Sequence, residues 1–75
     1  MNIEFVEQHA YFIFTINGEY YRVSFERNEK DSDWAVRLID VSRNETVSSK
    51  TLDAVVTPDI QLAEEIVKMY ALRGG

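Results

Sequence analysis

The sequence predicts an α+β fold, in which an antiparallel sheet of three to four strands is covered on one face by a single C-terminal helix. Three observations predict it: two alternating segments around Asn17-Gly18, a third alternating segment over residues 34–41, and a helical apolar repeat after Thr57. We expect one domain spanning residues 1–75, because 75 residues are too few for two.

The first two strands are predicted to form a tight hairpin. Residues 11–16 and 19–27 alternate in side-chain type, and Asn17-Gly18 between them suits a two-residue turn with positive φ at both positions. Such a turn places Ile16 opposite Glu19 and aligns the large apolar side chains of both strands on one face. The resulting pairs are Phe14 with Tyr21, Phe12 with Val23, and Ala10 with Phe25.

The other face of this hairpin is amphipathic, with Tyr11 opposite Ser24, Ile13 opposite Arg22 and Thr15 opposite Tyr20. Before the hairpin, residues 2–5 also alternate. They predict either a short additional strand or a lead-in at the sheet edge.

The following segments predict two further strands. Residues 28–33 contain no apolar side chain and form a solvated loop, whereas residues 34–41 place Trp34, Val36 and Leu38 on one face. Ile39 and Val41 fall on the opposite face, which favours a bulge or two-sided burial near Leu38 and Ile39. Residues 42–45 then turn the chain, and the polar residues 46–52 are typical of an edge strand.

Thr57-Pro58-Asp59 predicts the start of the helix, with Thr57 as its cap, proline in the first turn and an acid at the positive end. Glu64 and Lys68 are spaced to pair on the solvent side, while Arg73 and then Gly74 suit the C-terminal end. The predicted apolar face comprises Ile60, Ala63, Ile66, Val67, Tyr70 and Ala71.

The composition argues against catalysis and cofactor binding. There is no cysteine, so thiolate catalysis, disulfides and cysteine-type metal sites are excluded. His9 is the one histidine, and it has no nucleophile or metal-ligand motif around it in the sequence. Asp31 and Asp33 lack the rest of a calcium-loop pattern. We therefore expect no enzyme activity, no cofactor and no metal.

Two groups of residues are candidates for binding. The first is an aromatic and basic surface of Tyr11, Tyr20, Arg22 and Arg37 on the amphipathic sheet face, which favours a protein partner or, as an alternative, single-stranded nucleic acid. The second is an acidic edge, suited to mimicking nucleic acid in a charge-mimic inhibitor. It comprises Glu26, Glu29, Asp31 and Asp33.

The net charge of −5 disfavours a dominant phosphate-binding role and permits a basic partner. The leading hypothesis is therefore a small acidic, non-catalytic interaction or regulatory module of bacterial or phage origin that binds another protein. We expect no signal peptide and no membrane-spanning segment, hence a cytoplasmic location. We also expect a homodimer, because the core is thin and the polar fourth strand leaves an edge free for a second copy.

Overall fold

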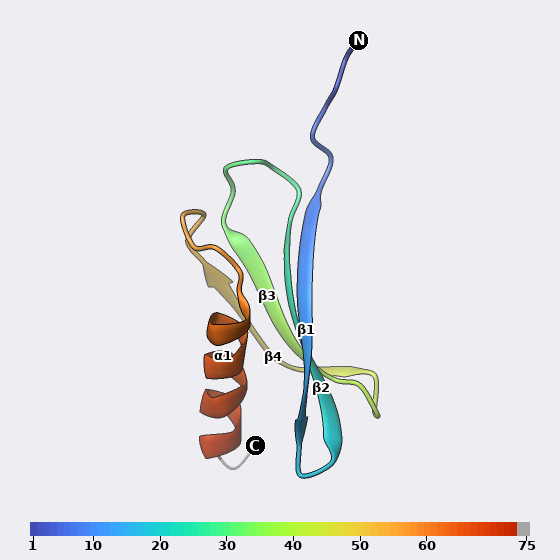
Figure 1. Ribbon diagram of the computed structural model, residues 1–75, viewed down its shortest axis with the longest axis vertical. Helices are drawn as coiled ribbons and strands as arrows, with labels where there is room; N and C mark the ends of the chain where they lie inside the picture. The colour runs from blue at the N-terminus through green and yellow to red at the C-terminus, as the bar shows by residue number, and fades with distance from the viewer. Residues whose placement is uncertain (74–75) are drawn as a thin grey trace.

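The computed structural model describes residues 1–73 and consists of one four-stranded antiparallel sheet with a helix packed on one face (Figure 1). The strands follow one another in chain order across the sheet, so β1 and β4 are the two edges. This confirms the predicted α+β class. The elements are β1 (Gln8–Ile16), β2 (Glu19–Arg27), β3 (Trp34–Asp40), β4 (Glu45–Leu52) and α1 (Ile60–Leu72).

The β1–β2 hairpin has the predicted register. Ile16 lies opposite Glu19, Phe12 opposite Val23, and the pairing continues to Gln8 opposite Arg27. Asn17 and Gly18 both have positive φ, 52° and 84°, as a two-residue turn between twisted strands requires. The turn therefore fixes which side chains of the hairpin face the helix.

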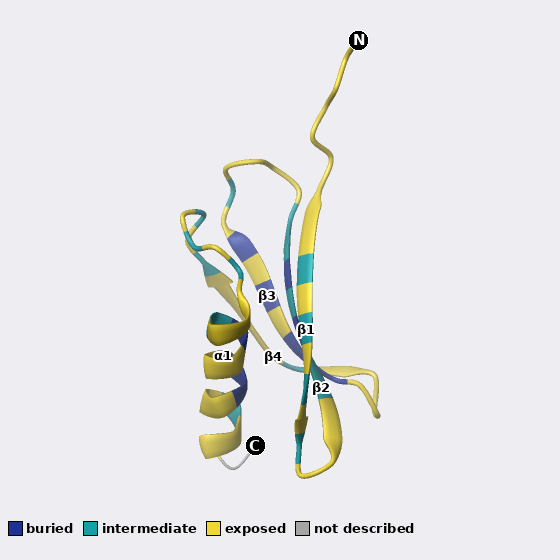
Figure 2. Ribbon diagram, in the orientation of Figure 1, coloured by how far each residue is buried: buried dark blue, intermediate teal, exposed yellow. Residues whose placement is uncertain are grey.

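The core lies between α1 and the two central strands. Its buried residues come from the inner faces of β2 and β3 and from the middle of the helix, and Figure 2 shows the burial concentrated where these elements face one another. These residues are Val23, Phe25, Trp34, Val36, Leu38, Ala63, Ile66 and Val67. The apolar residues of the edge strand β1 that pack against this core are only half-buried.

The predicted bulge is confirmed, because the β3–β4 register shifts between Leu38 and Ile39. The turn that follows lies one residue earlier than predicted, so β4 begins at Glu45. Asp40 stabilises this turn from a buried position by accepting a hydrogen bond from the backbone N–H of Arg43 at 3.2 Å. Asn44 supplies the left-handed residue, with φ of 53°.

The predicted helix cap was wrong by two residues. Asp59, not Thr57, is the N-cap: its backbone is extended, and its carboxylate accepts a hydrogen bond from the N–H of Leu62 at 2.8 Å. Pro58 therefore precedes the cap instead of occupying the first helical turn. An Asp side chain caps at least as well as Thr, and here it is the residue next to the first helical turn.

The apolar face of the helix also differs from the prediction. Ile60 and Ala71 are exposed, while Leu62 is half-buried against the core. The helix is rotated about its axis so that Leu62 faces the core and Ile60 does not. The apolar repeat does not predict this rotation, because the residues on both sides of the buried face are apolar. Glu64 and Lys68 pair at 3.4 Å as predicted. The predicted cap at Gly74 lies outside the described residues, and the C-cap is Arg73.

Trp34 anchors the connection between β4 and α1 to the sheet. Its indole N–H donates a hydrogen bond of 2.8 Å to the backbone oxygen of Val56, and the guanidinium of Arg27 lies 4.2 Å from its ring centroid. Nearby, Asp33 accepts a hydrogen bond from the N–H of Ala54. These contacts hold the end of the β2–β3 loop against the segment that leads into the helix.

Residues 1–7 form a lead-in and not an additional strand. All seven are exposed, and the segment runs away from the sheet beyond the end of β1 (Figure 1). The pairing of β1 with β2 ends where Gln8 meets Arg27, so the preceding residues have no neighbouring strand on that side.

Candidate binding surface on the open sheet face

The candidate binding surface is the face of the sheet that α1 does not cover, and we call it the open face. The cross-strand pairs assign its members, since side chains alternate between the two faces of a strand. From β1 to β4 they are His9, Tyr11, Ile13, Thr15, Tyr20, Arg22, Ser24, Glu26, Ala35, Arg37, Ile39, Thr46, Ser49 and Thr51. The four residues predicted as an aromatic and basic surface all lie on this face.

Large apolar side chains remain uncovered on the half of the open face nearest β1. Tyr11 is 63% exposed, Ile13 54% and Tyr20 55%. Arg22 lies opposite Ile13 on one neighbouring strand and opposite Ile39 on the other, so its direct cross-strand neighbours on this face are both apolar. Exposed aromatic rings beside arginine are the composition typical of protein-binding surfaces.

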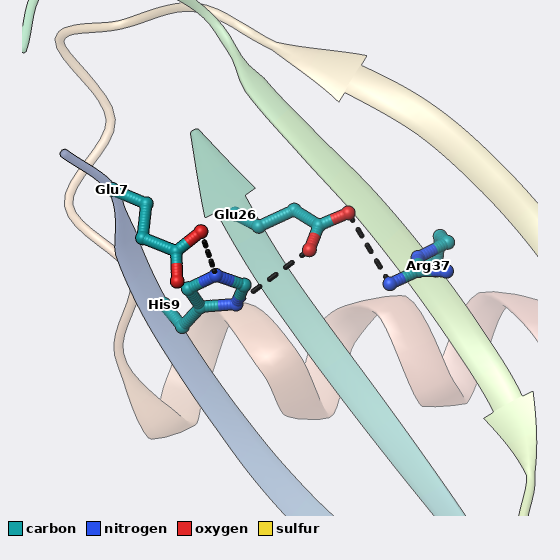
Figure 3. Close-up of polar contacts among 4 residues, drawn as sticks. All are labelled: Glu7, His9, Glu26 and Arg37. Carbon is teal, nitrogen blue, oxygen red and sulfur yellow. Dashed lines mark ion pairs between the residues drawn. The ribbon is translucent and has the colours of Figure 1, made fainter. Parts of the chain in front are cut away.

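A chain of ionic contacts crosses one end of the open face (Figure 3). The two ring nitrogens of His9 lie 3.4 Å from a carboxylate oxygen of Glu7 and 3.5 Å from one of Glu26. The other carboxylate oxygen of Glu26 lies 3.2 Å from the guanidinium of Arg37. The chain links β1, β2 and β3, and it ends at Arg37, which is half exposed.

The open face carries less negative charge than the rest of the chain. Two arginines, Arg22 and Arg37, balance the carboxylates of Glu26 and, at its end, Glu7, so the face is formally neutral, whereas the chain carries −5. The acidic excess therefore lies on the other surfaces. An acidic molecule approaching the protein meets its least repulsive surface here.

The predicted acidic edge is divided between two surfaces. Glu26 belongs to the open face, where Arg37 and His9 face its carboxylate. Glu29, Asp31 and Asp33 stay in the β2–β3 loop, where Asp33 accepts the hydrogen bond from Ala54 and the carbonyl of Glu29 accepts two from Ser32. The loop therefore has a defined shape, and Glu26 is not part of its surface.

Tyr21 lies on the helix side of the sheet, near the hairpin turn. Its ring is 5.7 Å from that of Tyr70 on α1, at an angle of 52°. Partial burial raises the pKa of the Tyr21 hydroxyl, and the neighbouring Tyr70 and the carboxylates of Asp40 and Glu19 raise it further. This contact ties the last turns of the helix to the start of β2.

The geometry of the described residues offers no candidate metal site. Within residues 1–73, no three side chains of His, Cys, Asp or Glu gather closely enough to hold a metal ion. None of the described helices has the length and apolar content needed to cross a bilayer.

The sequence interpretation missed the role of Glu26 and Glu7 around His9. The hairpin register contained the signal, because it places His9 directly opposite Glu26. Given that pair, the Glu26 carboxylate is expected to contact both His9 and a basic residue on the next strand.

We compared the chain with protein families, with curated proteins and with solved structures, and none of them matches it.

Proposed function

We propose that this chain is a small non-catalytic interaction module that binds another protein through the open face of its sheet. The observation that carries the proposal is the group of Tyr11, Ile13 and Tyr20, each more than half exposed and adjacent to Arg22. Such a surface buries much apolar area on contact, and the arginine orients a partner that offers carboxylates. A regulatory role in the cytoplasm of a bacterium or in a phage-infected cell is part of the same proposal.

A partner of this kind presents apolar groups together with acidic ones. The open face is formally neutral on a chain of −5, so an acidic partner is repelled less by this face than by the loop and helix surfaces. The charge-mimic alternative predicts the reverse, namely a basic partner at Glu29, Asp31 and Asp33. The two readings therefore differ in the surface contacted and in the charge of the partner.

Site-specific cross-linking in cells that express the protein tests the proposal. A photoreactive phenylalanine analogue replaces Tyr11 on the open face or, as the matched control, Lys68 on the outer side of α1. We expect defined protein adducts from position 11 alone, and their loss when Tyr20→Ser and Arg22→Ser are introduced together. Equal labelling from both positions, or adducts that survive the double substitution, would contradict the assignment of the face.

Single-stranded nucleic acid is the second candidate, because Tyr11, Tyr20, Arg22 and Arg37 share one face. Sheet surfaces with exposed aromatic rings and arginines stack bases and pair with phosphates. Against this, Arg37 already faces Glu26, and the chain as a whole repels a polyanion.

A fluorescence anisotropy titration separates the two candidates. Labelled mixed-sequence oligonucleotides are titrated with the protein at low salt, where phosphate contacts are strongest. The protein-binding proposal expects no saturable binding at micromolar concentration. Saturable binding that weakens with salt and is lost with Tyr20→Ser and Arg22→Ser would favour the nucleic-acid function.

A further inference from the structure

The two edges of the sheet differ sharply in how they are protected against pairing. Strand β4 is interrupted by the register shift opposite Leu38 and Ile39 and carries Glu45 and Lys50, features that discourage the addition of another strand. Strand β1 is regular, nine residues long, and contains no Asp, Glu, Lys or Arg between Gln8 and Ile16. The unprotected edge is therefore β1, and not the fourth strand that the sequence suggested.

The backbone of β1 presents a row of free hydrogen-bonding groups. In a two-residue hairpin, Ile16 and Glu19 form the hydrogen-bonded pair, so the even-numbered residues of β1 bond to β2. The hydrogen bond from the N–H of Val41 to the backbone oxygen of Tyr20 agrees with this alternation. It shows that even-numbered residues of β2 bond to β3, which leaves the odd-numbered ones to bond to β1. The N–H and C=O groups of His9, Tyr11, Ile13 and Thr15 therefore point away from the sheet.

The inner face of β1 is also incompletely covered. Phe12 and Phe14 are only half-buried, although Val23 and Phe25 on the adjacent strand are fully buried. Helix α1 covers one side of these rings, and the free edge leaves the other side open. A strand added next to β1 would bury them further and supply the missing hydrogen-bond partners.

We propose that the occupant of this edge is β1 of a second copy of the chain, paired antiparallel about a two-fold axis at Phe12. This register pairs all nine residues of the strand and sets Ala10 against the partner subunit's Phe14, a small side chain against a large one. On the open face it sets Tyr11 against the partner subunit's Ile13. No two charged side chains are opposed, and the odd-numbered residues form about eight hydrogen bonds across the seam.

The neighbouring registers are less favourable. A shift by two residues in one direction brings Glu7 into the ladder opposite Thr15, and a shift in the other direction brings Asn17, which is part of the turn, opposite His9. Both shorten the paired segment and separate Ala10 from Phe14. The register centred on Phe12 gives a closed dimer with one continuous eight-stranded sheet and both helices on the same side.

Mass measurement and hydrogen exchange on the isolated protein test the dimer without any other partner. We expect the mass from sedimentation equilibrium to rise from 8.7 kDa to twice that value between about 1 µM and 1 mM. Over the same range the amides of His9, Tyr11, Ile13 and Thr15 become protected from exchange. A mass that stays at 8.7 kDa, growth beyond the dimer, or a dimer in which these four amides exchange as before would each overturn the proposal.

A charge-swap pair of variants tests the register. Tyr11→Lys with Ile13→Lys opposes like charges twice across the seam, so we expect dimerisation to weaken by about tenfold or more. Tyr11→Glu with Ile13→Lys is the matched control, because it opposes unlike charges in the same places and restores the affinity. Equal affinities of the two variants would exclude the register, and thermal melting followed by circular dichroism checks that both are folded.

This inference does not rest on the proposed binding of another protein. An extended segment of a different protein could occupy the same edge, and in that case the isolated chain stays monomeric and its odd-numbered β1 amides remain unprotected. At position 11 an adduct with a second copy reports the dimer, whereas an adduct with a different protein reports the proposed function. Failure of dimerisation would remove the first kind of adduct alone, and failure to label a different protein would leave the dimer standing.

Discussion

Replacing Trp34 with phenylalanine isolates the contact that holds the β4–α1 connection on the sheet. The indole is 1% exposed, and its N–H donates to the oxygen of Val56 at 2.8 Å. Phenylalanine keeps most of the apolar ring but has no donor. It also presents a smaller face to the guanidinium of Arg27, which lies 4.2 Å from the ring centroid.

The expected loss of stability follows from three contributions. Leaving the Val56 carbonyl without its donor costs about 1–2 kcal/mol. The space left by the missing ring atoms costs about 1 kcal/mol after partial relaxation, and the weaker cation–π contact costs about 0.5 kcal/mol. The sum is about 3 kcal/mol, a large part of the roughly 4–11 kcal/mol expected for a domain of this size.

Urea unfolding followed by far-ultraviolet circular dichroism measures this loss without relying on tryptophan fluorescence. Trp34→Phe should lower the midpoint while leaving the slope unchanged, because the surface exposed on unfolding stays nearly the same. Tyr20→Phe is the control, since it changes an exposed aromatic ring and should alter the free energy of unfolding by less than about 0.5 kcal/mol. A loss below about 1 kcal/mol for Trp34→Phe would refute the anchoring role.

Three further predictions concern other parts of the molecule. Because the pKa of the Tyr21 hydroxyl is raised in the folded state, its contribution to the free energy of unfolding is complete below about pH 10 and is lost as pH rises through the folded-state pKa. Tyr21→Phe should therefore flatten the fall in the free energy of unfolding at alkaline pH, and an unchanged profile would contradict this. Asn44→Val should cost about 1–2 kcal/mol, because φ is 53° there, whereas Asn44→Gly should be nearly neutral in thermal melts, so equal costs would rule out the backbone explanation. Glu26→Gln should change stability by less than about 1 kcal/mol, since its ionic contacts are partly exposed; a larger change in chemical denaturation would show that the ionic chain holds the strands together.

The sheet was predictable because its determinants are local. Asn17-Gly18 fixes the turn, the turn fixes the register, and the register decides which residues of β1 and β2 face the helix. The bulge at Leu38 and Ile39 was predictable for a related reason, since the apolar pattern changes face at that point.

The helix start and rotation were harder to predict because they depend on tertiary contacts. Thr57 and Asp59 are both good caps in isolation, and the choice between them is made by where the chain meets the core. The rotation that buries Leu62 and exposes Ile60 likewise depends on the position of the sheet. The anchoring bond from Trp34 to Val56 joins residues far apart in sequence, and no local pattern signals it.

The ionic chain around Glu26 was missed for a different reason. The two contacts of Glu26 join it to His9 on β1 and to Arg37 on β3, so they require the sheet order as well as the hairpin register. Composition alone assigned Glu26 to an acidic edge with Glu29, although alternation along β2 turns its side chain to the open face.

The proposed dimer and the proposed binding face reinforce each other physically. Pairing two β1 strands about an axis normal to the sheet leaves both open faces on the same side, so the exposed Tyr11 and Ile13 of the two copies meet at the seam. The exposed apolar area is then continuous across the dimer, with Arg22 of each copy flanking it. Two copies of one site on a rigid sheet bind a repeated or two-fold symmetric partner far more tightly than one copy does. Tyr11 and Ile13 belong to both surfaces, so the charge-swapped pair separates the two roles: it restores the dimer without restoring the apolar side chains. Cross-linking from Ser24 to another protein should therefore stay low in Tyr11→Glu with Ile13→Lys; recovery of those adducts together with the dimer would show that partner binding needs the paired arrangement and not the apolar side chains themselves.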